Sequence, residues 1–303
     1  MCIRDRASKP LDFPPGTDWQ YSNTGYVVAG AIVQKVSGQS LIGFLQARIF
    51  GPLHMMRVTE DDTAPLQPAD AGAYTRYGLG PVRPAAKEAA GWLFAASELA
   101  MDPGTLALWD ISLMDRSLLK PESYAALTTP VKLKSGKDTG YALGLEVASQ
   151  HGRREISHDG AGSGFLADNA LWPEDKVAVV ALTNNDWASP AEIVDRIAFV
   201  MLKPDAAEAR ARDVFSGFQH GTVDRDLFTD NANAYLSQAV LADQKTGLGS
   251  LGPLRLFKLK RESMRGGMQT RIWSIITATR TLMAVERSFP GGKIEQFMVV
   301  AAD

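Results

Sequence analysis

Tyr21 and Asn23 are two residues apart, and both side chains are of types that do chemistry in active sites. If both project from one turn, the phenol can move a proton while the carboxamide donates and accepts hydrogen bonds. Alone the pattern is weak, because Tyr-x-Asn occurs by chance and a tyrosine at the start of a helix is more often a packing residue. A second signal elsewhere in the chain is therefore needed.

The second signal is a histidine followed by small residues far downstream. His158 is two residues before Gly160, and Ala161 and Gly162 come next. Glycines keep a strand edge free of bulky side chains, which an edge approached closely by a substrate requires. The plain alternative is a surface histidine in a glycine-rich hairpin. Together with Tyr21, the pattern favours the functional interpretation.

Both patterns have a counterpart in a known superfamily. Residues 15–26 resemble the second active-site motif of the serine β-lactamases and penicillin-binding proteins, in the branch of class C β-lactamases, D-alanyl-D-alanine carboxypeptidases and family VIII esterases. Residues 155–165 resemble the His-x-Gly form of its third motif. Residues 49–55 also look like this group, except that His54 replaces the usual glycine. We expect that change to affect a helix-ending turn and not the chemistry.

The resemblance implies a role for each site residue. Tyr21 takes part in proton transfer, Asn23 holds a lysine amine and the substrate amide, and His158 orients Tyr21 or polar groups of the substrate. Ala161 N–H is one of two oxyanion-hole donors, and the main chain near Gly160 pairs with the substrate. The substrate-binding set that the resemblance implies is Ser22, Gly160 and Ala161.

The family's first motif, Ser-x-x-Lys, holds the nucleophile one helical turn before a lysine. Fewer residues precede Tyr21 than that motif needs, so we expect it to be missing from this sequence. Ser117–Lys120 fits the pattern, but Pro121 follows directly and breaks the required helix. Lys245–Gly247 matches Lys-Thr-Gly, but its neighbours favour a loop over a strand. We interpret both as coincidences.

Residues 1–6 resemble translated adapter sequence of the kind seen at the ends of assembled reads, and we interpret them as an artefact. The alternative is an ordinary N-terminus. If residues 1–6 are an artefact, the chain is expected to be an N-terminally truncated fragment that lacks its nucleophile and is inactive alone.

The implied fold class is α/β. Residues 7–203 are predicted to form a partial β-lactamase/transpeptidase-like domain, with a helical cluster and an antiparallel sheet but without its N-terminal part. Hydrophobic periodicity and capping residues predict helices at 24–37 (capped by Asn23 or Thr24), 40–50, 103–114, 121–127 and 190–202. Strand patterns cover 141–147, 154–158, 164–172 and 176–183, with a turn at 173–175. Residues 51–93 should form a long surface excursion.

Residues 204–303 are predicted to form a separate α+β domain. Helices are expected between 205 and 244, a glycine-rich turn at 247–252, and strands near 254–262, 268–277, 281–288 and 293–301. The order of helices followed by a curved sheet resembles cystatin-like or nuclear-transport-factor-like folds. No catalytic constellation is visible in this part of the sequence.

Composition excludes several classes. The chain has 303 residues, 45% hydrophobic and 22% charged, with a formal net charge of −2. The sequence has no clustered run of Lys and Arg residues of the kind that binds nucleic acid. The single cysteine, Cys2, and four scattered histidines indicate no metal site, and no cofactor is expected. No apolar run approaches the roughly 20 residues that span a bilayer. The resemblance suggests a periplasmic or secreted protein; the oligomeric state is left open.

Two functional hypotheses follow. The first is a serine hydrolase that acts through an acyl-enzyme on a β-lactam, a D-amino-acid peptide or a carboxylic ester, with a small molecule or peptide as its partner. His158 in the third motif favours a peptide, amide or ester over a β-lactam. The second is a non-catalytic binding or scaffold protein built on the same fold. A Ser-x-x-Lys upstream in the reading frame would favour the first.

Overall fold

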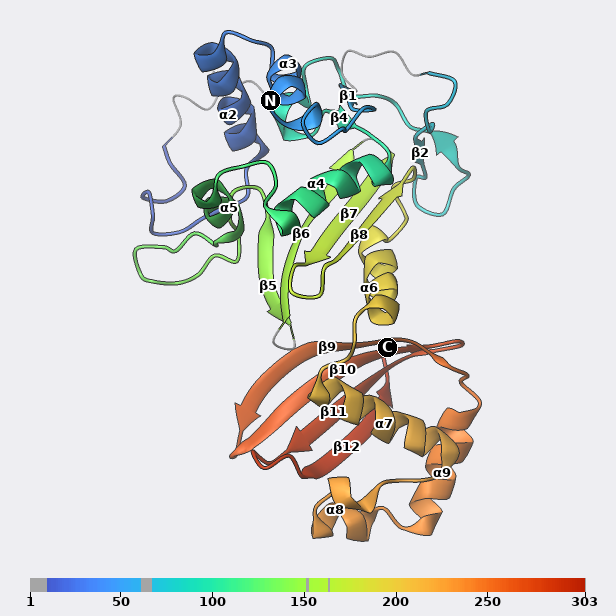
Figure 1. Ribbon diagram of the computed structural model, residues 1–303. Helices are drawn as coiled ribbons and strands as arrows, with labels where there is room; N and C mark the ends of the chain where they lie inside the picture. The colour runs from blue at the N-terminus through green and yellow to red at the C-terminus, as the bar shows by residue number, and fades with distance from the viewer. Residues whose placement is uncertain (1–9, 61–66, 151–152, 163, 303) are drawn as a thin grey trace. The chain divides into compact units, whose positions relative to one another are not determined.

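The chain forms two compact units in a computed structural model that describes residues 10–60, 67–150, 153–162 and 164–302 (Figure 1). Unit 1 comprises Met1–Ser149 and Arg154–Val194, and unit 2 comprises Gln150–Arg153 and Asp195–Asp303. Residues 1–6, which the sequence predicts to be an artefact, lie outside the described residues.

Unit 1 is organised around a four-stranded sheet with the strand order β5-β6-β7-β8. The strands β6, β7 and β8 pair in antiparallel fashion, with His158 opposite Asn169. The buried side chains of this part gather between the sheet and the helices, at Leu113, Tyr124, Leu145, Ile156 and Leu171. The strand bounds are β5 Glu146–Gln150, β6 Arg153–Gly162, β7 Phe165–Trp172 and β8 Val177–Thr183.

The β7 and β8 strands confirm the prediction, whereas β6 continues through Gly162 instead of ending at His158, and the first strand starts later than predicted. Residues 141–145 form a turn, in which Ala142 N–H donates to Leu145 C=O and Gly140 and Gly144 have φ of 71° and 84°. Glycines adopt these positive φ values readily, and such values are incompatible with an extended strand. Tyr141 lies next to this turn and forms an isolated antiparallel bridge with Glu146, the first residue of β5.

The N-terminal helices begin at serine caps. Ser22, with extended backbone, accepts a hydrogen bond from Gly25 N–H and starts α2 at Asn23–Ser37, which ends at Gly38 with φ of 70°. The predicted cap at Asn23 or Thr24 is therefore wrong by one or two residues. Ser40 caps α3, Leu41–Leu45, as predicted, and a π-helical segment, Gln46–Phe50, continues it.

The segment after these helices is a run of short pieces. Two-residue strands pair as β1 with β4 and β2 with β3. His54, φ 56°, adopts the left-handed conformation in the turn after the π-helical segment, which explains why glycine suits that position. The bounds are β1 Thr59–Glu60, β2 Tyr74–Thr75, β3 Arg83–Pro84, a 3₁₀ turn Phe94–Ala96 and β4 Leu99–Ala100.

Two proline-led helices support the sheet. Asp102 caps α4, Pro103–Asp115, by accepting from Thr105 N–H. In Figure 1, α4 crosses in front of β7 and β8, and it packs against β8. The helix α5 spans Pro121–Thr128, and Lys120 before it is extended (φ −67°, ψ 152°). Residues Ser117–Lys120 are therefore not helical, as Pro121 predicts, and cannot hold a Ser-x-x-Lys site.

Unit 2 consists of helices followed by a four-stranded antiparallel sheet with the order β12-β11-β10-β9. Its core contains Phe215, Phe218, Phe257 and Trp273, all nearly or fully buried. The strand predictions are confirmed, with β10 and β11 at the predicted bounds. The elements are α7 Ala206–His220, a 3₁₀ turn Arg225–Leu227, α8 Asp230–Tyr235, α9 Gln238–Gly249, β9 Leu254–Arg265, β10 Met268–Thr277, β11 Thr281–Ser288 and β12 Ile294–Ala301.

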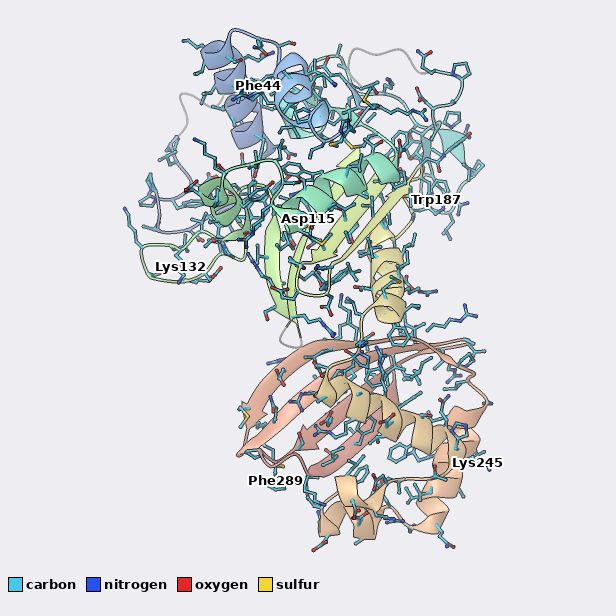
Figure 2. All side chains as sticks on the ribbon, in the orientation of Figure 1. Phe44, Asp115, Lys132, Trp187, Lys245 and Phe289 are labelled. Atoms are coloured by element: carbon cyan, nitrogen blue, oxygen red, sulfur yellow. The ribbon has the colours of Figure 1, made fainter. Side chains whose placement is uncertain are left out.

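One local prediction in unit 2 is wrong. Lys245–Gly247 lies inside α9 and not in a loop, and Figure 2 shows Lys245 on that helix. A helical Lys-Thr-Gly is also not the strand that the family's third motif requires. The helix α6, Pro190–Met201, was predicted to end at 202 and spans the division between the units in the sequence.

Membrane-spanning length is not reached by any single helix among the described residues. The α2 helix and the following Leu41–Phe50 stretch meet the length and hydropathy criteria only when taken together, and a bend of 74° separates them.

Candidate active site

Tyr21 is positioned by the turn before α2. Thr17 N–H donates to Pro14 C=O, and Gly16 C=O, in a residue with φ of 82°, accepts from Lys134 N–H. The bond from Lys134 joins the N-terminal segment to the 131–141 loop. Trp19 then stacks on Tyr141 with ring centroids 5.4 Å apart. Tyr21 is thereby directed back toward the sheet, just before the cap of α2.

The structure brings Tyr21 and His158 together from distant parts of the chain. Their ring centroids are 6.0 Å apart. Tyr141 completes a triangle, because its ring lies 5.9 Å from that of Tyr21 and 5.9 Å from that of His158. The two candidate catalytic residues therefore share one aromatic cluster, whose third member the sequence analysis did not name.

Hydrogen bonds connect this cluster to α2. Tyr141 Oη lies 2.9 Å from His158 Nε2, and Tyr26 Oη lies 3.4 Å from Tyr141 Oη. On the other side of the imidazole, His158 Nδ1 contacts the backbone oxygen of Asp159 at 2.5 Å. Both imidazole nitrogens are thus engaged, and His158 is bonded to Tyr141 and not to Tyr21.

Both phenols near His158 are held protonated. Burial raises the pKa of Tyr141 far above its ordinary value. The pKa of Tyr21 is also raised, first by burial and then by the charges of Tyr26 and Asp159. At neutral pH Tyr21 is therefore a protonated phenol in this chain.

The other two members of the tripeptide differ in what they can offer. Ser22 Oγ accepts from Gly25 N–H at 3.2 Å, so it is committed to capping α2. Asn23 is the first residue of that helix; it is exposed, and its side chain makes no hydrogen bond to the residues that the structure describes. Asn23 is therefore free to bind an incoming group, whereas the hydroxyl of Ser22 already has a structural partner.

Gly160 and Ala161 lie in the second half of β6, after His158. The ten-residue β6 is twice as long as its neighbour, the five-residue β5, so β5 cannot pair with all of it. On the other side, Ala161 is opposite Leu166 of β7. At least half of β6 therefore has no partner in β5.

The glycines of β6 are not demanded by the fold. A Cβ at Gly160 would have ordinary contact with Ala167, and a Cβ at Gly162 would meet nothing within 4 Å. Gly164 differs: its φ is 74°, and a Cβ there would lie 2.8 Å from Tyr74 N. Gly164 is thus explained by packing. Gly160 and Gly162 have no such packing requirement.

Three neighbours of the site were missed by the sequence analysis: Trp19, Tyr26 and Tyr141. Trp19 and Tyr26 lie within the tripeptide's own flanks, so their proximity could have been inferred. Tyr141 lies between Gly140 and Gly144, and an aromatic residue between two glycines in a predicted strand is a weak sign of a turn that presents it. No local pattern pairs it with His158.

A buried carboxyl lies on the helix α4. Asp110 is fully buried and accepts a hydrogen bond of 2.9 Å from Asn169, the residue opposite His158 in the sheet. Its second oxygen, Oδ2, has no hydrogen-bond partner among the described residues. Burial raises the pKa of Asp110 to about 7, and the Asn169 bond opposes this only in part.

Asp110 should make the stability of unit 1 depend on pH. Its folded pKa of about 7 exceeds the unfolded value of about 3.9. Below about pH 4 both states are protonated, and from about pH 4 to 7 only the unfolded state loses the proton, so stability falls as pH rises and then stays low. The shift corresponds to a loss of up to about 4 kcal/mol.

Asp110→Asn should therefore raise the free energy of unfolding at about pH 8 by about 2 to 4 kcal/mol and leave it nearly unchanged at about pH 4. Urea unfolding at several pH values measures this difference. Asp115→Asn, at an exposed position of the same helix, is the control and should give a small, pH-independent change. Equal behaviour of the two variants would show that burial does not hold the Asp110 proton.

The beta-lactamase family model matches residues 3–199. A D-aminopeptidase of Gluconobacter oxydans is 26% identical over 179 residues, which cover 59% of this chain and 34% of that protein. Penicillin-binding protein 4* of Bacillus subtilis is 27% identical over 188 residues, covering 57% of this chain and 41% of its own length. The chain thus spans less than half of these curated relatives.

A solved structure supports the same grouping. The crystal structure of a D-stereospecific amidohydrolase from a Streptomyces species is similar with a TM-score of 0.57 and 26% sequence identity. The similarity covers 65% of this chain and 59% of that one.

Proposed function

Because the chain belongs to the beta-lactamase family, we propose that it carries the tyrosine, asparagine and histidine motifs of a serine hydrolase that works through an acyl-enzyme. One observation supports this most strongly. Tyr21 and His158, from motifs far apart in the sequence, are 6.0 Å apart as ring centroids, beside a strand whose glycines the fold does not require.

The reaction proceeds in two steps. A serine Oγ attacks the substrate carbonyl, forms a C–O bond and yields its proton to the lysine and Tyr21, which pass it to the leaving nitrogen or oxygen. Water then cleaves the acyl-enzyme. Ala161 N–H and the N–H of the nucleophile stabilise the tetrahedral oxyanion, while Asn23 binds the lysine amine and the substrate amide.

The nucleophile is the part that residues 1–303 do not supply. Ser117–Lys120 is not helical, so it cannot place a serine one turn before a lysine. We therefore assign the nucleophile to a Ser-x-x-Lys in a longer form of the protein. Without the serine no acyl-enzyme can form, so the 303-residue chain is expected to be inactive by itself.

The substrate class we favour is an amide or short peptide of a D-amino acid. Relatives and a structural neighbour bear the names D-aminopeptidase and D-stereospecific amidohydrolase. A carboxylic ester is the second choice, since a relative is a lovastatin esterase. His158 in place of a third-motif lysine speaks against a β-lactam. By resemblance the protein is periplasmic or secreted, which cell fractionation would test.

Turnover by the longer protein tests the substrate assignment. A D-alanyl peptide, p-nitrophenyl butyrate and a chromogenic cephalosporin would be compared at equal enzyme concentration. We expect the highest kcat/KM for the D-alanyl peptide and the lowest for the cephalosporin. Fast cephalosporin turnover would contradict the substrate assignment, and no turnover of any of the three would contradict the proposed function.

A further inference from the structure

We propose that Tyr141 is a positioning residue which, backed by Tyr26, holds the His158 imidazole in one orientation and one tautomer as the support for Tyr21. The inference rests on the proposed function for its effect on catalysis. Its structural part, the direction of the hydrogen bonds through His158, does not depend on any activity.

The direction of these bonds follows from the acceptor at one end. The backbone oxygen of Asp159 can only accept, so His158 Nδ1, 2.5 Å away, must carry the hydrogen. In a neutral imidazole the other nitrogen is then a lone-pair acceptor. His158 Nε2 therefore accepts, and the atom 2.9 Å from it, Tyr141 Oη, donates.

Tyr141 is suited to be a permanent donor. Its pKa is raised by burial, so it does not ionise near neutral pH. Because its single proton points to His158, its oxygen is left as an acceptor, and the bond of 3.4 Å from Tyr26 Oη is donated by Tyr26. The sequence of donors is thus Tyr26 to Tyr141 to His158 to the backbone of Asp159.

The three side chains in this series of hydrogen bonds come from different parts of the structure. Tyr26 lies in the first turns of α2, Tyr141 between two glycine turns, and His158 on β6. Trp19 stacks on the face of Tyr141 and limits the movement of its ring. The Tyr141 hydroxyl is bonded to Tyr26 and its ring is stacked on Trp19, so it can hold the imidazole more firmly than the strand alone could.

The consequence for the site is geometric. Tyr21 has ring contacts with both His158 and Tyr141 and, unlike them, is 47% exposed. Since both nitrogens of His158 are engaged, the imidazole cannot serve as a hydrogen-bonded base to Tyr21. The imidazole and the Tyr141 ring both contact the Tyr21 ring, and these contacts set where the Tyr21 hydroxyl points. Misplacement of a reacting group by about 1 Å can lower the rate about 100-fold.

Nitrogen-15 NMR of the 303-residue chain tests the structural part. In mildly alkaline buffer His158 should show a protonated Nδ1 and a hydrogen-bonded, unprotonated Nε2; a His158→Gln spectrum assigns the signals. In Tyr141→Phe the Nε2 signal should move to the position of an unbonded nitrogen. A protonated Nε2, or an unchanged signal in Tyr141→Phe, would overturn the proposal.

Kinetics of the longer protein test the catalytic part. Tyr141→Phe should lower kcat about 10- to 100-fold with KM changed less than about 3-fold, while Tyr26→Phe has a smaller effect in the same direction. Tyr77→Phe, at a 76% exposed position of unit 1, is the control and should be neutral.

If the longer protein is active and Tyr141→Phe leaves its kcat unchanged, the inference is overturned. A longer protein without any turnover would instead contradict the proposed function, and the NMR result would then decide the inference alone.

Discussion

Replacing Tyr21 by phenylalanine is expected to lower kcat/KM of the longer protein about 100- to 10,000-fold, the range typical of general acid–base groups. The substitution keeps the ring, and with it the contacts to Tyr141 and His158 near 6 Å. It removes only the hydroxyl, which in the proposed mechanism moves the proton between nucleophile and leaving group. The loss should therefore lie in kcat, because ground-state binding does not use that proton. Steady-state kinetics on the D-alanyl peptide measure both parameters.

The control for this substitution is again Tyr77→Phe, which removes the same atom from an exposed ring. Thermal unfolding of both variants should match the wild type, since Tyr21 Oη makes no hydrogen bond to the described residues. A Tyr21→Phe enzyme with kcat within about 3-fold of wild type would show that another group moves the proton.

Glu286→Ala is expected to destabilise unit 2 by about 3 to 5 kcal/mol, as loss of one partner from a buried charge cluster does. Glu286 is fully buried and accepts from Arg210 at 2.7 Å, Arg271 at 3.3 Å and Trp273 Nε1 at 3.1 Å. Alanine would leave these three donors facing a vacated site. Hydrogen exchange of peptides from β10 and β11, followed by mass spectrometry, reports the local loss of stability.

Glu262→Ala is the matched control, because this carboxylate also pairs with Arg271, at 2.8 Å, but is 42% exposed. Exposed pairs contribute about 0 to 1 kcal/mol, so exchange in β10 and β11 should change little. If both variants loosened the sheet equally, burial of Glu286 would not be the source of its effect.

Elements with strong local signals could be predicted from the sequence. Asp102 followed by Pro103 predicts the start of α4, and Pro121 predicts both the start of α5 and the break after Lys120. In unit 2 the alternation of side chains between turn residues gave β10 and β11 at their observed bounds. Caps, prolines and strand periodicity act over a few residues, so they are visible without the fold.

The errors arise where packing overrides these signals. The glycines predicted a turn at 247–252, but α9 continues to Gly249. A Cβ at Gly249 would lie 2.9 Å from the backbone oxygen of Gln219, near the end of α7. That glycine permits close approach of two helices. At α2, three adjacent residues are capable of capping, and only the extended backbone of Ser22 decides between them.

The candidate site divides in the same way. Tyr21 and His158 are found by motif because each sits in a characteristic local sequence. The bond between Tyr26 and Tyr141 joins residues 115 positions apart, and its existence depends on how the N-terminal segment lies on the 131–141 loop. Such a contact has no local signature, so the support of His158 could only be seen in the structure.

Intact-mass spectrometry after exposure to a fluorescent penicillin and to a D-amino-acid ester tests the central claim most directly. The account predicts an acyl adduct on the longer protein, mapped by peptide analysis to the serine of a Ser-x-x-Lys before Tyr21, and no adduct on the 303-residue chain. An adduct or ester turnover on the 303-residue chain, or an adduct at Ser117, would contradict it.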